Sequence, residues 1–415
     1  MRKIVKSLAS AAAVAAAALT FTACPSTQST ESAESSDVVE VGILHSLSGT
    51  MAISEVSLRD VLMMGIEEIN ASGGVLGKKI SAKIVDPASN VDLFAEKAKE
   101  LLGKDQVKAV FGCWTSVSRK AVLPVFEEYK GLLFYPVQYE GQECSPNIIY
   151  SGATPNQQLI PATEYLMSED GGEYKKFYLL GTDYVFPRTA NTILKNFLLA
   201  SGVPAANIVE EYTPFGHQDY QTIVSKIKRF AATGDACVLS TINGDSNVPF
   251  YKEFANQGLT ADKCPIMAFS VAEDELRAMD TEYLAGHLAA WNYFQSEESP
   301  ENKKFVADFK AFCKKNNLPG GADRVTDDPI CWAYTDLYLW KAAVEKAKSF
   351  EVKDVIAALS DMEFVSPAGR VKMHKENHHL AKYAVIGEIR KDGQFNVLSK
   401  TSDLVVPEPF SKFSK

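Results

Sequence analysis

Apolar runs that suit β-strands alternate with helical segments along most of this chain. VVEVGIL at 38–44 precedes a helical pattern at about 59–71, which Gly73 and Gly74 end, and the strand-like KKISAKIVD follows. Parallel strands need a long crossover between them, usually a helix, whereas antiparallel strands can be joined by a short turn. The alternation therefore predicts an α/β protein built from βαβ units around parallel sheets.

The same alternation begins again after TPNQQ at 154–158. KKFYLLG, IVEEYTP, ACVLST and PIMAFS are strand-like and are separated by helical patterns. Near the end, GRVKM and YAVIGEIRKDGQFNVL are expected to form antiparallel strands, with Asp392 and Gly393 as a hairpin turn. Because the chain is too long for one ordinary domain, the two series predict two α/β lobes.

The N-terminus has the pattern of a signal peptide at 1–23. Basic residues precede an alanine-rich apolar run ending near Phe21, and at roughly 14 residues this run is shorter than the about 20 that a membrane span needs. Cys24 follows the small residue Ala23, which favours a lipoprotein with lipid on Cys24 over ordinary cleavage with a free cysteine. A flexible tether rich in Ser, Thr and Glu is expected at 24–37.

Composition describes a globular protein. Hydrophobic residues make up 46% and charged ones 23%, which is typical of a well-buried chain. The formal charge of -9 makes nucleic acid an unsuitable partner and favours solubility as its main effect.

Seven cysteines become six if Cys24 carries lipid, and six permit up to three disulfides in an oxidising compartment. For Cys113, Cys237 and Cys264, in or beside strand-like runs, a buried thiol is at least as good an interpretation. The histidine cluster at 374–379 lies in a polar KENHH stretch, which favours a solvated loop over a metal site. We expect no metal and no cofactor.

Polar and aromatic residues gather where predicted strands end. The carboxyl ends of parallel strands meet at one edge of a sheet, and ligands bind there. The segment from Phe111 to Gly141 supplies two such ends, so Trp114, Thr115, Ser116, Tyr135 and Tyr139 would converge on a single cleft. The candidate ligand-binding residues are Trp114, Thr115, Ser116, Tyr135, Gln138, Tyr139, Asp183, Tyr184, Phe186, Asn243 and Ser270.

Several of these residues have structural alternatives. Trp114 and Tyr135 could be packing aromatics. Ser116 could cap the following helix, Asp183 could serve a turn or cap, and Glu273 could be a first-turn helix residue. These alternatives stay open at the level of sequence.

Catalysis is not indicated. GxSxG, HExxH and GxxxxGK[ST] motifs are all missing from the sequence. His217 could in principle partner Ser116, but no orienting acid is recognisable, and Glu140 is a lone acid among aromatics. We therefore expect a binding protein with no catalytic residues.

Long motifs resemble a known family. HSLSGTMAISE, INASGGVLGKKI, FGCWTSVSRKAVLPVFE, LLFYPVQYEG, YLLGTDYVFPRTAN and DRVTDDPI are similar to the substrate-binding protein of urea ABC transporters, over about 41–406. That family belongs to the type I periplasmic binding proteins, with branched-chain amino-acid receptors and a short-chain amide sensor. The resemblance implies two doubly wound lobes joined by three crossover strands and closing over ligand. The implied lobes are 38–156 with 292–363, and 157–291 with 364–415.

The resemblance also suggests site residues and partners. The amide sensor's ligand-holding motifs are similar to the positions of Trp114, Ser116, Tyr135, Tyr184 and Ser270, although a tyrosine is usual where this chain has Trp114. A Thr-Pro pair likewise stands where this chain has Val-Gln at 137–138. The implied function is an extracytoplasmic receptor, anchored to the membrane by lipid, that binds urea and delivers it to the permease of an ABC transporter. Short-chain amides, branched-chain amino acids or a secreted sensory role are the alternatives.

Overall fold

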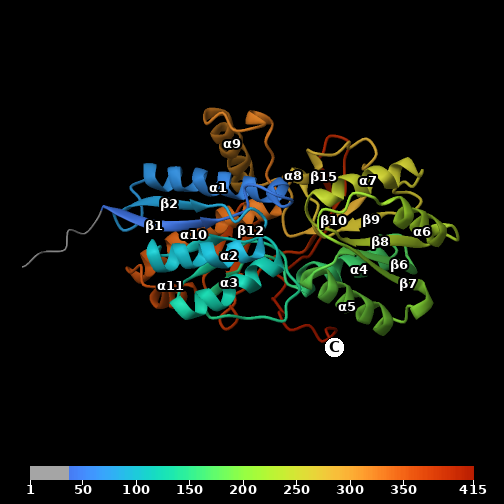
Figure 1. Ribbon diagram of the computed structural model, residues 1–415, viewed down its shortest axis with the longest axis horizontal. Helices are drawn as coiled ribbons and strands as arrows, with labels where there is room; N and C mark the ends of the chain where they lie inside the picture. The colour runs from blue at the N-terminus through green and yellow to red at the C-terminus, as the bar shows by residue number, and fades with distance from the viewer. Residues whose placement is uncertain (1–36) are drawn as a thin grey trace, which may run out of the picture. The chain divides into compact units, whose positions relative to one another are not determined.

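The structure is a computed structural model, and it describes residues 37–415 (Figure 1). The predicted signal peptide, the lipid site at Cys24 and nearly all of the tether lie outside the described residues. Within 37–415, none of the helices has the length and apolar character to cross a membrane.

The first sheet has five strands, all parallel, in the order β2-β1-β3-β4-β5. Each strand except the last is followed by a crossover segment, as the sequence alternation predicts, and α1 to α3 are the helices of those crossovers. The elements are β1 (Val38–Leu44), α1 (Ala52–Ala71), β2 (Lys79–Val85), α2 (Val91–Lys99), the π-helical η1 (Glu100–Lys104), β3 (Val110–Gly112), α3 (Ser116–Tyr129), β4 (Leu133–Tyr135) and β5 (Ile148–Tyr150).

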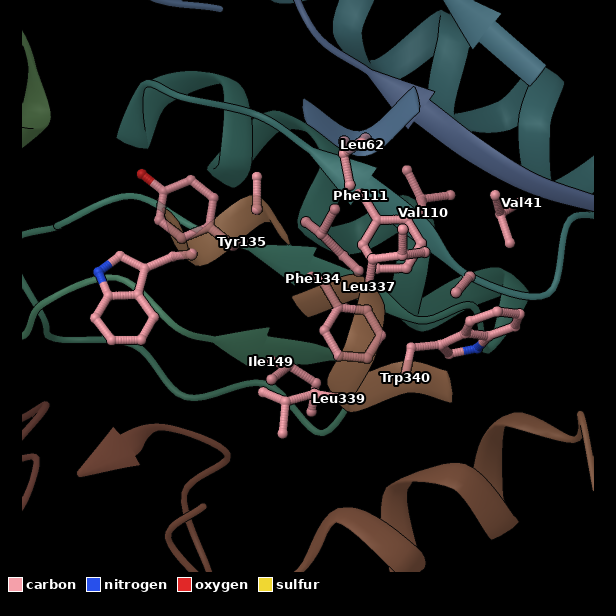
Figure 2. Close-up of a cluster of buried hydrophobic side chains, with 14 of the residues drawn as sticks. Val41, Leu62, Val110, Phe111, Phe134, Tyr135, Ile149, Leu337, Leu339 and Trp340 are labelled. Carbon is pink, nitrogen blue, oxygen red and sulfur yellow. The ribbon is translucent and has the colours of Figure 1, made fainter. Parts of the chain in front are cut away.

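Later segments return to complete the core of this first lobe. In Figure 2, Phe111 and Phe134 from neighbouring strands lie against Leu337 and Trp340 of α10, and the two phenyl rings stack with centroids 5.1 Å apart. Removing this apolar area from water is the main stabilising contribution of such a core. The returning elements are α9 (Pro300–Lys315), α10 (Asp328–Ala347), α11 (Val352–Leu359), β11 (Glu363–Ser366), β12 (Gly369–Met373) and β13 (Leu380–Ala381).

The second lobe is built on a seven-stranded sheet in the order β15-β14-β10-β9-β8-β6-β7. Strands β6 to β10 are parallel, and β14 and β15 add antiparallel at one edge. Gly393 donates its N–H to the Arg390 carbonyl between β14 and β15, which confirms the predicted hairpin. The strands are β6 (Lys176–Thr182), β7 (Ile208–Thr213), β8 (Ala236–Thr241), β9 (Ile266–Ala268), β10 (Leu288–Trp291), β14 (Val385–Ile389) and β15 (Phe395–Lys400).

The connections in the second lobe are mostly helical. They are the 3-10 turn η2 (Pro155–Gln157), α4 (Leu159–Met167), α5 (Val185–Ala200), η3 (Ala205–Asn207), α6 (Gln221–Ala231), η4 (Gly244–Ser246), α7 (Asn247–Asn256) and α8 (Glu273–Leu276). A further 3-10 turn, η5 (Gly321–Asp323), follows α9 in the first lobe.

Three passages of the chain connect the lobes, and a buried side chain on one of them bonds to the other two. The Asn292 amide donates to the Gln157 carbonyl at 3.0 Å and to the Tyr383 carbonyl at 2.7 Å. The third passage thus lies between β13 and β14, whereas the resemblance implied one near 364–369. The reason is that β11, β12 and β13 form their own sheet, whose Val371 and Leu380 pack in the first core.

Within residues 37–415, the structure tests the expectations for the cysteines and for the histidine cluster. All six described cysteines are free thiols, and only Cys144 among them is exposed. His379 is fully buried and stacks on Tyr150 at 4.3 Å, so the expectation of a solvated histidine loop was wrong at this position. Among the described residues, no cluster of His, Cys, Asp and Glu could hold a metal ion.

Candidate functional site

The turn from β3 into α3 presents the first group of predicted site residues. Cys113 adopts a left-handed conformation with φ 66°, and Trp114 and Thr115 then lead into the helix. The Thr115 hydroxyl oxygen accepts the Ser118 N–H at 3.2 Å, so Thr115 is the helix cap and Ser116 is the first helical residue. The interpretation of Ser116 as the cap was therefore wrong.

A buried ionic cluster lies behind this turn. The Ser116 hydroxyl donates to Glu140, and Arg119 donates to Ser116 at 3.1 Å, to Glu140 at 3.2 Å and to Glu143 at 2.8 Å. Burial opposes ionisation of Glu143, but the charges and hydrogen bonds of Arg119 and Lys120 prevail and lower its pKa to about 2. Glu140 is therefore a partner in ion pairing and is not placed to act as a free general base.

Aromatic rings enclose the guanidinium of this cluster. The Arg119 carbon lies 4.9 Å from the Tyr135 ring centre and 4.5 Å from that of Tyr139. The Tyr135 hydroxyl donates to the Trp114 carbonyl at 2.6 Å, and the Tyr139 hydroxyl lies 2.6 Å from a ring nitrogen of His379. Both hydroxyls are thus bonded inside the first lobe, and these tyrosines build a wall rather than present free donors.

Gln138 carries the network across to the second lobe. Its amide nitrogen donates to the Phe269 carbonyl and to the Ser270 hydroxyl, both at 2.7 Å, and the Ser270 hydroxyl donates to the Asn243 side-chain oxygen at 3.0 Å. All three side chains are almost fully buried, and the Gln138 side-chain oxygen has no hydrogen-bond partner. The structure thus brings together Gln138, Asn243 and Ser270 from three strand ends in two lobes.

Asp183, Tyr184 and Phe186 follow β6, and the structure places them in different surroundings. The Tyr184 ring lies 4.7 Å from Phe215 and 6.3 Å from Phe186, and its pKa is raised by burial and by the nearby Tyr135 and Glu140. Tyr184 therefore lies close to the first-lobe wall, whereas Phe186 is part of the buried core of the second lobe. Asp183 does not join them, because it is exposed and pairs at 2.8 Å with the exposed Arg188.

Sequence reasoning missed a buried group at the end of β1. His45 and Ser46 follow this strand directly, and Glu55 lies in the first turn of α1. Glu55 accepts the Ser46 N–H at 2.8 Å and lies 3.2 Å from a His45 ring nitrogen, and all three residues are fully buried. Ligands bind at the carboxyl ends of parallel strands, and this rule selected Trp114 after β3. It applies equally to His45 and Ser46, since β1 lies beside β3 in the sheet.

The rims of the two lobes meet through a second set of contacts. The Ser54 hydroxyl donates to Glu275 of α8 at 2.6 Å, Ser57 donates to Asp274, and Arg324 bonds both Ser57 and Asp60. Acids accumulate here, and burial raises the pKa of the neighbouring Glu273 to about 8. Glu273 also accepts the Gln295 N–H at 2.7 Å, which is a structural role.

The candidate hydrolytic pair does not form. The Ser116 hydroxyl is bonded to Glu140, whereas the half-buried His217 bonds the Asp219 carbonyl in the second lobe. A nucleophile and its base must lie within hydrogen-bonding reach. The arrangement described here suits non-covalent binding between two surfaces.

Comparison with known proteins agrees with this architecture. Residues 39–415 match the periplasmic binding protein domain family, and the chain belongs to that family. The type I fold predicted from the sequence is confirmed. Finer specificity within the family stays a prediction.

Three relatives illustrate the range. A Leu/Ile/Val-binding protein homolog of Brucella melitensis is 23% identical over 376 residues, covering 87% of this chain and 90% of that protein. A solute binding protein of an ABC transporter from Rhodopseudomonas palustris HaA2, in complex with p-hydroxybenzoic acid, has a TM-score of 0.76 at 23% identity, covering 89% of this chain and 98% of that one. An isoleucine complex of a branched-chain amino acid transporter substrate-binding protein from Streptococcus pneumoniae has a TM-score of 0.70 at 19% identity, covering 89% of this chain and 100% of that one.

Proposed function

We propose that this protein is the urea receptor of an ABC transporter, exported, held at the membrane by lipid on Cys24, and delivering its ligand to the permease. It binds a small neutral ligand between its lobes, and ligand favours the closed arrangement that the membrane subunits recognise. The family membership supports the receptor class, and the motif resemblance supports urea.

One observation carries the preference for a neutral ligand. Arg119 and Lys120, the cations of the first turn and a half of α3, both pair with Glu140 and Glu143. Neither charge is left for a ligand carboxylate. An amino acid needs a partner for its carboxylate, whereas urea needs only hydrogen bonds and flat walls.

The walls and polar groups have the required character. Trp114, Tyr135 and Tyr184 are aromatic surfaces, and Gln138, Asn243 and Ser270 are neutral polar groups. Urea is planar, with four N–H donors and one carbonyl acceptor. A site of this composition can enclose it.

Calorimetric titration of the mature, ligand-stripped protein tests the proposal. We expect urea to bind, with formamide and acetamide weaker by roughly 10-fold or more, since one polar group or methyl in a fitted pocket is worth about 1 to 3 kcal/mol. Leucine should give no heat of binding. Binding of leucine without any response to urea would refute the urea assignment and leave the receptor class intact.

A branched-chain amino-acid receptor is the second candidate. The names of the Brucella and Streptococcus relatives favour it. The same titration separates the two candidates, because leucine is one of its ligands.

A further inference from the structure

The pair formed by His45 and Glu55 is buried and only half satisfied. A His45 ring nitrogen, Nδ1, lies 3.2 Å from Glu55 Oε2, which also accepts the Ser46 N–H. The other ring nitrogen, Nε2, and the other carboxylate oxygen, Oε1, are buried without any hydrogen-bond partner. Leaving a buried polar atom unpaired is unfavourable, so each such atom in a native protein calls for an explanation.

The pair lies between two predicted site residues. On one side, the Glu55 charge adds to burial in raising the pKa of the Cys113 thiol, and Cys113 immediately precedes Trp114. On the other side, the first turn of α1 approaches the second lobe directly after Asn243. A Cβ added to Gly244 would lie 2.9 Å from the Thr50 carbonyl oxygen and 3.0 Å from the Met51 sulfur. Glu55 follows within this turn, since its N–H bonds the Met51 carbonyl at 3.0 Å.

Two of the unpaired buried atoms in the predicted site are oxygens. A carboxylate can only accept hydrogen bonds, so Glu55 Oε1 is a buried acceptor without a partner. The Gln138 side-chain oxygen is another buried acceptor without a partner. Unpaired buried acceptors suit a ligand that donates N–H bonds.

We propose that Glu55, with His45 bonded to its other oxygen, is a ligand-binding residue that accepts the N–H groups of a neutral carboxamide or urea. This inference rests on the proposed function and deepens it, because it assigns the N–H groups of the ligand to residues of the first lobe. The ligand carbonyl is left to donors elsewhere in the site, for which the indole N–H of Trp114 and the hydroxyl of Tyr184 are candidates.

The variant Glu55→Gln tests the assignment by calorimetric titration with urea and acetamide. Its amide oxygen can keep the bonds to Ser46 and His45, while its NH2 then faces the ligand's N–H groups, and we expect affinity to fall at least 10-fold. Glu68→Gln is the matched control. It makes the same change on the same helix, at a carboxylate bonded by Tyr334 and Tyr338, and should leave affinity within twofold.

A measurement on the unmodified protein keeps the inference testable if Glu55→Gln fails to fold. Acetate and acetamide are close in shape, but acetate offers no N–H group and carries negative charge. We expect acetamide to bind and acetate to bind at least 100-fold more weakly. Equal binding of acetate and acetamide, or unchanged affinity in a folded Glu55→Gln protein, overturns the role of this pair while the receptor function stands. Failure of the unmodified protein to bind urea, formamide and acetamide overturns the proposed function and this inference together.

Discussion

The two walls of the predicted cleft are held in different ways. The first-lobe wall is fixed by a closed set of charged partners, in which Arg119 bonds Ser116, Glu140 and Glu143 beneath two tyrosine rings. The second-lobe wall relies on neutral groups such as Ser270 and Asn243 and on the Tyr184 ring. The first wall is thus held by ionic bonds within one lobe, whereas the second is held by a few neutral hydrogen bonds, one of which joins Ser270 to Gln138 of the first lobe.

The largest expected effect is a loss of stability when Arg119 is removed from the buried ionic cluster. Arg119→Ala leaves Glu140 and Glu143 buried without their main cation, and breaking a buried ion pair typically costs about 3 to 5 kcal/mol. Denaturant unfolding should show a loss of that order. Arg188→Ala, which removes an exposed pair, should change stability by less than about 1 kcal/mol. A similar small loss in both variants would remove the distinction between the two walls.

Second in size is the effect of Ser270→Ala on ligand affinity. The change removes the acceptor of Gln138 and the donor to Asn243, and so weakens the bonding that joins the lobes. We expect urea affinity to fall by about 10-fold, equivalent to about 1.4 kcal/mol, with a stability loss of about 1 kcal/mol. Unchanged affinity, measured by calorimetry, would mean that this network plays no part in closure.

The acids at the rim should make stability depend on pH. Burial raises the pKa of Glu273 from about 4.5 to about 8, so between these values the folded protein binds more protons than the unfolded chain. Stability should therefore fall as pH rises from about 5 to 8, by on the order of 2 kcal/mol. Glu273→Gln should flatten the curve, whereas Glu282→Gln, at an exposed pair, should not. Stability at each pH would be measured by unfolding in guanidinium chloride, since urea is the proposed ligand. A dependence on pH of equal slope in all three proteins would exclude Glu273 as the cause.

The smallest expected effect belongs to Asp183→Ala. Asp183 is exposed and pairs only with Arg188, so both stability and ligand affinity should stay within about 0.5 kcal/mol of the original values. A clear loss of affinity would mean that Asp183 is a ligand-binding residue and that the second-lobe wall is also charged.

Much of the fold could be predicted because its signals are local. Apolar runs, helix stops and the turn at Asp392 and Gly393 follow from short-range patterns. The structure places Gln138, Asn243 and Ser270, three of the predicted site residues, in one hydrogen-bond network. Thr115 as the cap was missed because two adjacent hydroxyl residues precede the helix, and only backbone geometry separates them. His379 was misjudged because its polar neighbours in sequence are not its neighbours in space.

The sequence by itself determined the α/β class, the two lobes and the residue types that end each strand, since these depend on periodicity and on chain connectivity. The tertiary structure decided which of those residues are bound to one another and which face the cleft. Asn292 joins all three passages, Arg119 is buried among acids, and His45 meets Glu55 beside β3. Such contacts join residues that are distant in the chain or lie on different elements, and burial and hydrogen bonding select them only when strands and helices have packed.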